Sequence, residues 1–199
     1  MSGSPTDPAS PAPLRNPELL GRATSRLLLI DLQEKLLPHI PVSAQVVENC
    51  RRLLVGAATL GVPAWGTEQY PAGLGQTVEP LRSLLGELPE KVRFSATEAL
   101  GWGTVTDCTD NRDQVVVAGV ETHVCVLQTV FDLLAAGWRV SVVADAAGSR
   151  NKSDWHTALQ RMADMGATIT STESVLFEWC EAAGTDEFRT ISRLVTGRA

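Results

Sequence analysis

The chain has 199 residues, which is the size of one α/β domain and leaves little room for a second. Hydrophobic residues make up 44% of it and charged residues 20%, so the composition is that of a globular protein rather than a disordered chain. A formal net charge of -6, without a cluster of Lys and Arg to neutralise phosphates, excludes a general nucleic-acid binder. A small-molecule substrate is therefore expected.

Location and domain limits are predicted from the same composition. No apolar run approaches the ~18 residues of a membrane span, and the N-terminus has no basic segment followed by an apolar one. These features predict a cytoplasmic protein without a membrane partner. Residues 1–20 are rich in Pro, Ser and Ala and are expected to form a flexible tail, while residues 21–199 are expected to form the domain.

Strands and helices are predicted to alternate along the domain. The expected strands are at residues 27–31, 62–67, 115–118, 138–144 and 167–170, and the expected helices are at 46–61, 122–137, 154–165 and from 172 onward. Such alternation predicts a doubly wound, mainly parallel β-sheet with helices on both faces, a three-layer α/β/α fold. Residues 96–113 give no clear pattern.

The first strand, Leu-Leu-Leu-Ile, is followed at once by Asp31. Ligands of open α/β sheets bind at the carboxyl ends of strands, so this carboxylate is a candidate site residue, although taken alone it is better read as a cap of the next turn. Gln33 falls close to the same edge. Its amide is interpreted either as a substrate contact or as a group that stabilises the turn.

The segment QVVVAGVETHVCVLQTVFDLL, residues 114–134, carries the strongest chemical signal. A buried strand is followed by a tight turn and by a helix whose first turn contains Cys125. Unpaired N–H groups and the positive end of the helix dipole lie there, and they lower a thiol pKa. This arrangement can build a nucleophile elbow, but a free cysteine packed as a small hydrophobe is an equal reading of this segment alone.

Three motifs together resemble one family. GVETHVC with the helix after it, RLLLIDLQ near the start, and EKVRFS occur in the order found in the isochorismatase-like cysteine hydrolases, which include nicotinamidases and N-carbamoylsarcosine amidohydrolases. The likeness is closer to the YcaC-related branch and the isochorismatase domain-containing proteins. It covers residues 22–179.

The resemblance implies a catalytic triad of Asp31 as base, Lys91 and the nucleophile Cys125. It also implies a cis peptide at Val120-Glu121, with an oxyanion held by the backbone N–H groups of Glu121 and Cys125. On this basis we expect hydrolysis of a small amide or related C–N compound through a thioester. His123, beside the nucleophile, is the runner-up as general base.

The loop TEQYPAGLG and the end of EKVRFS complete the predicted site, with Gln33, Tyr70 and Phe94 as candidate substrate-binding residues. Metal-dependent nicotinamidases carry an Asp-x-His pair in this region, and this chain has none. No metal or cofactor is therefore expected, and nicotinamide is a poor guess for the substrate.

Two alternatives stay open at this point: a catalytically silent member of the fold that serves in binding or assembly, and a thiol-redox protein using Cys125. An enzyme of this family could also be a homo-oligomer. Relatives of the family commonly form homo-oligomers, and Trp138, Trp155 and Trp179 fall near expected element ends, where a monomer has difficulty covering them. A homo-oligomer is the expectation.

Overall fold

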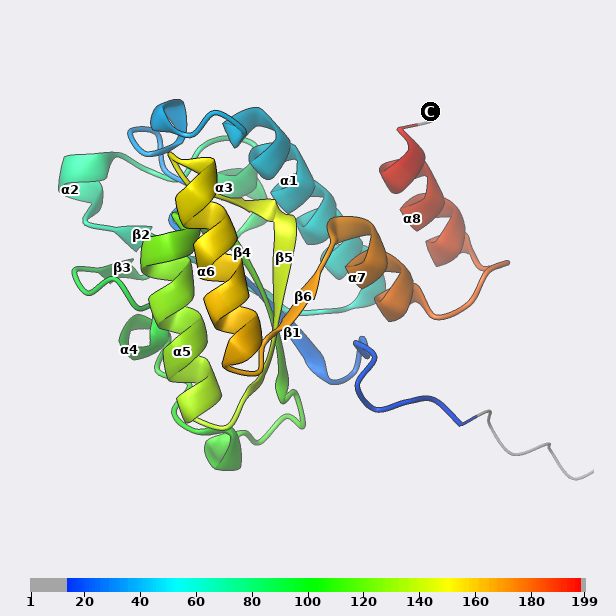
Figure 1. Ribbon diagram of the computed structural model, residues 1–199. Coiled ribbons are helices and arrows are strands. Elements are labelled where there is room, and N and C mark those ends of the chain that lie inside the picture. The colour runs from blue at the N-terminus through cyan, green and yellow to red at the C-terminus, as the bar shows by residue number, and fades with distance from the viewer. Residues whose placement is uncertain (1–13, 198–199) are drawn as a thin grey trace, which may run out of the picture.

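The computed structural model describes residues 14–197, and its centre is a parallel sheet (Figure 1). Its six strands follow the order β3-β2-β1-β4-β5-β6. Their bounds are β1 Ser25–Ile30, β2 Ala64–Gln69, β3 Glu90–Lys91, β4 Gln114–Val120, β5 Arg139–Gly148 and β6 Thr168–Thr170. The predicted doubly wound α/β/α fold is confirmed.

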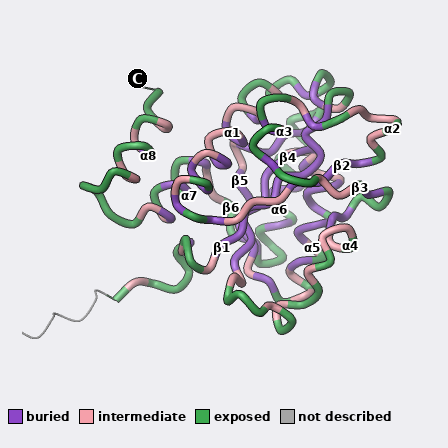
Figure 2. The backbone as a smooth tube through the Cα atoms, turned by 180° about the vertical axis from the view of Figure 1, so that it is seen from behind, coloured by how far each residue is buried: buried purple, intermediate pink, exposed green. Residues whose placement is uncertain are grey.

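The helices form two layers, one on each face of the sheet. Because successive side chains of a strand point to opposite faces, Leu27 and Leu29 of β1 enter one apolar cluster while Leu28 and Ile30 enter the other. The first cluster is covered by α1 (Ser43–Leu60), α7 (Thr172–Cys180) and α8 (Asp186–Thr196), and the second by α5 (Leu127–Ala135) and α6 (Lys152–Asp164). Figure 2 shows the resulting buried centre.

Short helical turns connect these elements: η1 Leu37–His39, α2 Pro71–Leu74, α3 Leu81–Leu84, α4 Thr97–Leu100, η2 Val105–Asp107 and the π-helix η3 Thr122–Val126. Strand order reverses direction between β1 and β4, which lie side by side in register from Ser25 and Gln114 onward. The carboxyl edge at such a switch point is where open α/β sheets bind ligands. β1, β4 and the loops after them therefore position the site.

The strand after residue 114 runs further than the predicted end at residue 118. Gly119 continues it with φ 126°, and an added Cβ there would lie 2.2 Å from the carbonyl oxygen of Ile30. Only glycine tolerates both the conformation and this approach to β1. β5 likewise continues to Gly148, past its expected end at residue 144.

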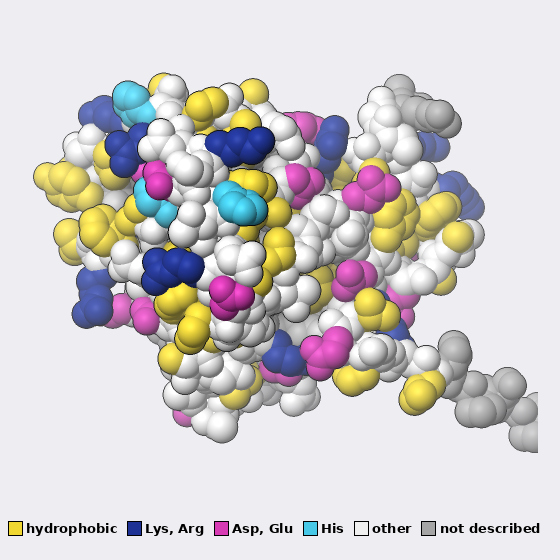
Figure 3. Space-filling view, in the orientation of Figure 1, with side chains coloured by type: hydrophobic (Ala, Val, Ile, Leu, Met, Phe, Trp, Pro, Cys, Tyr) yellow, Lys and Arg dark blue, Asp and Glu magenta, His cyan; other side chains and the backbone are white. Residues whose placement is uncertain are grey.

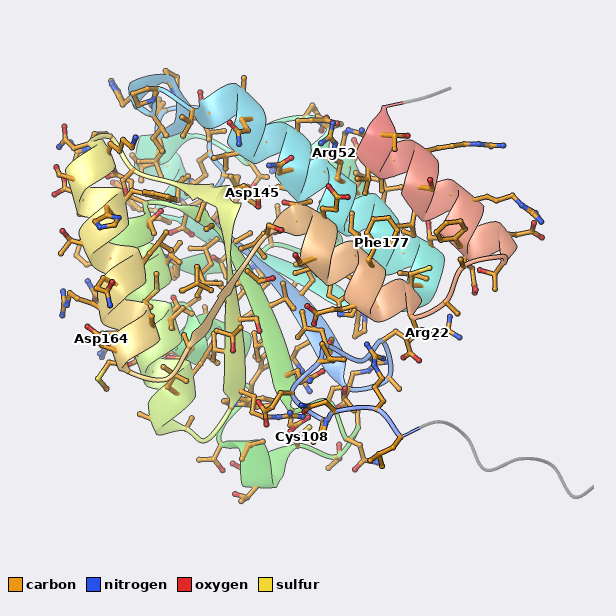
Figure 4. The ribbon with its side chains drawn as sticks, turned by 45° about the vertical axis from the view of Figure 1, so that its right-hand side comes forward. Arg22, Arg52, Cys108, Asp145, Asp164 and Phe177 are labelled. Carbon is orange, nitrogen blue, oxygen red and sulfur yellow. The ribbon has the colours of Figure 1, made fainter. Side chains whose placement is uncertain are left out.

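The unassigned residues 96–113 form α4, η2 and a loop at the amino end of the sheet. Trp102 lies against Trp65 and Trp138, and the guanidinium of Arg26 is 4.7–5.5 Å from the centres of these three rings. Cys108 lies beside this cluster, at the opposite end of the sheet from Asp145 (Figure 4). Aromatic packing around a cation, rather than periodicity, orders this segment.

The expected tail, residues 1–20, falls partly outside the described residues, since residues 1–13 are not described. Within the described part, Leu20 is buried, its N–H donates to Glu178, and Arg15 donates to the carbonyl oxygens of Leu20 and Glu178. Residues 14–20 thus lie against α7. Among residues 14–197, no helix combines the length and apolar character that crossing a bilayer requires.

Candidate active site

Asp31 directly follows β1 and is fully buried at the carboxyl edge of the sheet. Its backbone has φ 54°, a left-handed conformation that aspartate tolerates better than most residues. The neighbouring strand fixes it twice: its N–H donates to the carbonyl of Thr67 at 3.1 Å, and the Thr67 hydroxyl donates to Asp31 Oδ1 at 2.9 Å. The carboxylate is held in one orientation.

Lys91 reaches this carboxylate from β3, at the edge of the sheet. Its Nζ lies 2.6 Å from Asp31 Oδ2, 2.7 Å from Gln69 Oε1 and 2.9 Å from the carbonyl oxygen of Phe94. These three closest acceptors match the three protons of an ammonium, and the Arg93 carbonyl is a more distant fourth at 3.4 Å. Because only 3% of this side chain is exposed, Lys91 and Asp31 form a buried ion pair.

Cys125 lies on η3, the wide first turn of the helix that continues as α5. The turn is fixed to its surroundings, since the Thr129 hydroxyl donates to the Cys125 carbonyl at 2.7 Å and accepts from the N–H of Ala96 at 2.9 Å. Cys125 is 5% exposed, and its thiol interacts with both Asp31 and Lys91. The three residues of the predicted triad are thus brought together.

The proton affinities of the cluster depart from the expectation for a helix start. Burial raises the pKa of Asp31, and the ammonium of Lys91 opposes that rise. Burial also raises the pKa of the Cys125 thiol, and the Asp31 carboxylate raises it further, against the smaller opposing effect of Lys91. The lowered thiol pKa expected from helix position is therefore wrong, because burial and the Asp31 carboxylate both raise the pKa of the thiol.

The turn before Cys125 contains the cis peptide Val120-Glu121 that the family resemblance implied. The Glu121 carbonyl accepts the N–H groups of Val124 and Val126, which begins the wide turn. The Glu121 side chain accepts from the backbone N–H and the guanidinium of Arg150 at 3.0 and 3.1 Å.

His123 contacts two residues outside the triad. Its Nδ1 lies 3.0 Å from Ser149 Oγ, and its Nε2 lies 4.0 Å from Asp154. The two ring nitrogens thus face the residue that follows β5 and a residue of α6. Asp31 is the group with geometric access to the thiol proton, so His123 is the weaker candidate for the base.

The three candidate substrate contacts differ in their surroundings. Gln33 is fully buried, donates to the carbonyls of Gln69 and Gly75, and accepts the Gln69 N–H, so its amide is used to hold the loop after β2. Tyr70 and Phe94 are 58% and 51% exposed; the Tyr70 N–H donates to the Lys91 carbonyl, and the Phe94 carbonyl accepts from the Lys91 ammonium. Contact of any of the three with substrate stays a prediction.

Two members of the cluster, Thr67 and Gln69, had no predicted role. Both lie on β2, the strand between β1 and β3 that carries them to Asp31 and Lys91. Their place at the carboxyl end of the second strand was the available signal, because parallel neighbours end at one edge. Among residues 14–197 no three His, Cys, Asp or Glu side chains are grouped as metal ligands.

Asp31, Lys91 and Cys125 thus lie at the switch point of a doubly wound parallel sheet, which defines a three-layer α/β/α protein with a polar cluster at its carboxyl edge. The isochorismatase domain model matches residues 25–174. Isochorismatase domain-containing protein 1 of Danio rerio is 37% identical over 88% of this chain and 62% of that protein, and protein 2A of Mus musculus is 38% identical over 86% and 82%. The chain therefore belongs to the isochorismatase family, as its three motifs predicted.

Solved structures agree with this assignment. The MAR1 ribonuclease of Caenorhabditis elegans has a TM-score of 0.80 and 34% identity, over 90% of this chain and 93% of that one. YcaC of Escherichia coli, described as an octameric hydrolase of unknown specificity, has a TM-score of 0.78 over 91% and 92%; at 23% identity it shows a shared fold alone. The chain spans 62% of the length of the Danio rerio and Salmo salar relatives.

Proposed function

We propose that this protein hydrolyses a small amide or related C–N compound through a thioester on Cys125. The observation that carries the proposal is the buried Lys91–Asp31 pair at 2.6 Å, which acts on the Cys125 thiol. A purely structural cysteine has no need of a carboxylate and an ammonium beside it, and burying both charges is costly. Such an arrangement is useful for moving a proton in a dry site.

In the proposed first step, Asp31 takes the proton of the Cys125 thiol as the sulfur attacks the acyl carbon. A C–S bond forms, the carbonyl π electrons move to oxygen, and backbone N–H groups of the turn at Glu121 and Cys125 stabilise the oxyanion. The oxyanion then collapses, the C–N bond breaks, and protonated Asp31 gives its proton to the leaving nitrogen.

In the second step, water attacks the thioester while Asp31 accepts a water proton. The C–S bond breaks, and the proton returns to sulfur as the carboxylic acid leaves. Lys91 stays protonated throughout and keeps the negative charge of the site balanced, whether it lies on oxygen or on sulfur. Asp31 serves as base and then as acid in both halves.

The test is a screen of small amides, carbamoyl compounds and nitriles, followed by mass spectrometry of acid-quenched protein. An active compound is expected to leave an acyl adduct on the peptide containing Cys125. Cys125→Ala should abolish turnover and adduct while retaining the circular dichroism spectrum, and Cys180→Ala, on the far end of α7, is the matched control. Turnover retained by Cys125→Ala on a genuine substrate would refute the proposal.

The alternative of a silent binding or assembly protein remains a candidate, and an all-negative screen with intact fold would favour it. The ribonuclease activity named for the Caenorhabditis elegans neighbour is not proposed here. A net charge of -6 works against binding a polyanion. A fluorescently labelled RNA in the same screen tests that choice directly.

A homo-oligomer is proposed as the working form, with weaker support from tryptophan than the sequence indicated. Trp138 and Trp179 are 2% and 0% exposed, so the chain itself covers them, and the expectation that a monomer leaves them uncovered is wrong. Trp155 is half-buried and lines an apolar cavity. Light scattering after size exclusion gives the assembly state.

A further inference from the structure

A second concave site lies on the same edge of the sheet as the triad, beyond β5. It is a cavity of about 520 Å³ between the start of α1, the end of β5 and the start of α6. Its lining is mainly apolar, with Pro41, Val42, Val46, Ala144, Ala147 and Trp155. The volume is in the range of pockets that hold small molecules, and no triad residue lines it.

Positive charge lies at the rim of this cavity. Arg150 and Lys152, both exposed, belong to its lining. Arg150 is paired with Glu121, whereas Lys152 makes no ion pair or side-chain hydrogen bond with the other described residues. Figure 3 shows a Lys or Arg side chain at the upper end of an apolar strip beside α6. An apolar cavity with an unpaired ammonium at its rim fits a ligand that has a hydrocarbon part and an anionic group.

The one acidic residue of the lining, Asp145, is held at the opposite side of the cavity from Lys152's helix by its contacts with α7. The Asp145 carboxylate accepts the N–H and hydroxyl of Thr172 at 2.8 and 3.0 Å, which fixes it at the start of α7. Its backbone carbonyl accepts from Asn49 at 2.7 Å. Ser149, 5% exposed, adds a buried hydroxyl to the wall, where it is bonded to His123.

We propose that this cavity binds a small apolar carboxylate, with the hydrocarbon against Val42, Val46 and Trp155 and the carboxylate against Lys152. The site is separate from the triad, so the proposal does not depend on the hydrolase function. Its contacts with the catalytic turn are Ser149 to His123 and Arg150 to Glu121. The cavity lining therefore contacts Glu121 and His123, which precede Cys125 in the same turn.

Titration calorimetry of the full chain with 4-phenylbutyrate tests the site, with 4-phenylbutanol as the uncharged probe of the same shape. Saturable binding of the carboxylate is expected, with at least tenfold weaker binding of the alcohol. Lys152→Gln should weaken the carboxylate about tenfold. Arg161→Gln removes the same charge from the same helix, where its guanidinium lies over Phe131, and should leave binding unchanged.

Val42→Trp fills the cavity at a position that is 47% exposed, so it spares the core. It should abolish binding with an unchanged melting temperature. Binding that survives Val42→Trp would mean that the probe occupies another place, such as the Lys91 region, and would overturn the proposal. Equal affinity for alcohol and carboxylate would overturn it too. A third contrary result is that the wild-type protein binds no carboxylate and that Val42→Trp has a lower assembly mass in solution than wild type. A second copy of the chain would then cover the cavity.

Discussion

The buried pair of Lys91 and Asp31 is best tested by Lys91→Met, which keeps much of the side-chain length and removes the charge. The ammonium has three acceptors at 2.6, 2.7 and 2.9 Å and is 3% exposed, so water cannot replace it without opening the site. Removing one partner of a buried pair typically costs about 3–5 kcal/mol of unfolding free energy. We expect a loss of this size at pH 8.

The loss should depend on pH, and the sign follows from Asp31. Burial raises its pKa above the usual 3.8, and Lys91 opposes that rise, so removing Lys91 raises the pKa of Asp31 further. A carboxyl with a higher pKa when folded binds more protons in the folded state, and stability falls as pH rises above 3.8 toward the folded pKa. Lys91→Met should therefore be closer to wild type at pH 5 than at pH 8.

Urea unfolding followed by circular dichroism at both pH values, at one protein concentration, measures this effect. The double variant Asp31→Asn/Lys91→Met should recover more than half of the loss, because a neutral pair needs no counter-charge. A loss below about 1 kcal/mol at pH 8, or an equal loss at pH 5, would refute the interpretation of Lys91 as the counter-charge of a buried carboxylate.

Three further predictions concern the base that acts on Cys125, the glycine near the end of β4, and metals. Asp31→Asn should lower turnover at least 100-fold yet lower the pKa of the Cys125 thiol, since the carboxylate contributes to raising it; slower iodoacetamide alkylation at pH 8 would contradict this. Gly119→Ala should destabilise the protein by roughly 1–3 kcal/mol from backbone strain alone, and the clash with Ile30 should add to this loss. Gly61→Ala is the control: Gly61 has φ 71° with no atom near its added Cβ, and its loss in urea unfolding should be about 1–2 kcal/mol. A chelator should leave turnover unchanged, and stoichiometric zinc or iron by elemental analysis would oppose this.

The alternation of elements was predictable because it is local. Leu27 to Ile30 and Val115 to Val117 are apolar without interruption, and such runs are specific for strands covered on both faces. α8 was not predicted, although Phe188, Ile191 and Leu194 recur at helical spacing; Ile191 is its one fully buried residue. The ends of β4 and β5 depend on contacts with β1 and with each other, which a single segment does not contain.

The site was predictable as far as motifs and strand ends reach. Asp31 and Cys125 each follow a buried strand, and the order of strands then places them together. Lys91 lies on a strand of two residues, too short for any pattern, and was found through the family resemblance. Burial of all three at once is a tertiary property, which is why the direction of the thiol pKa was wrong.

That correction changes how the proposed nucleophile works. Burial raises the pKa of both proton-carrying groups, so the site disfavours a second negative charge on either. A single positive charge, on Lys91, interacts with the Asp31 carboxylate and with the Cys125 sulfur. Proton transfer from the Cys125 thiol to the Asp31 carboxylate moves the negative charge from oxygen to sulfur without adding a second negative charge. The ammonium of Lys91 therefore balances that charge before and after the transfer. In the proposed mechanism the thiolate therefore need not exist before substrate binds: it would form as the sulfur attacks the substrate carbonyl, and the backbone N–H groups of the turn at Glu121 would then stabilise the charge on oxygen.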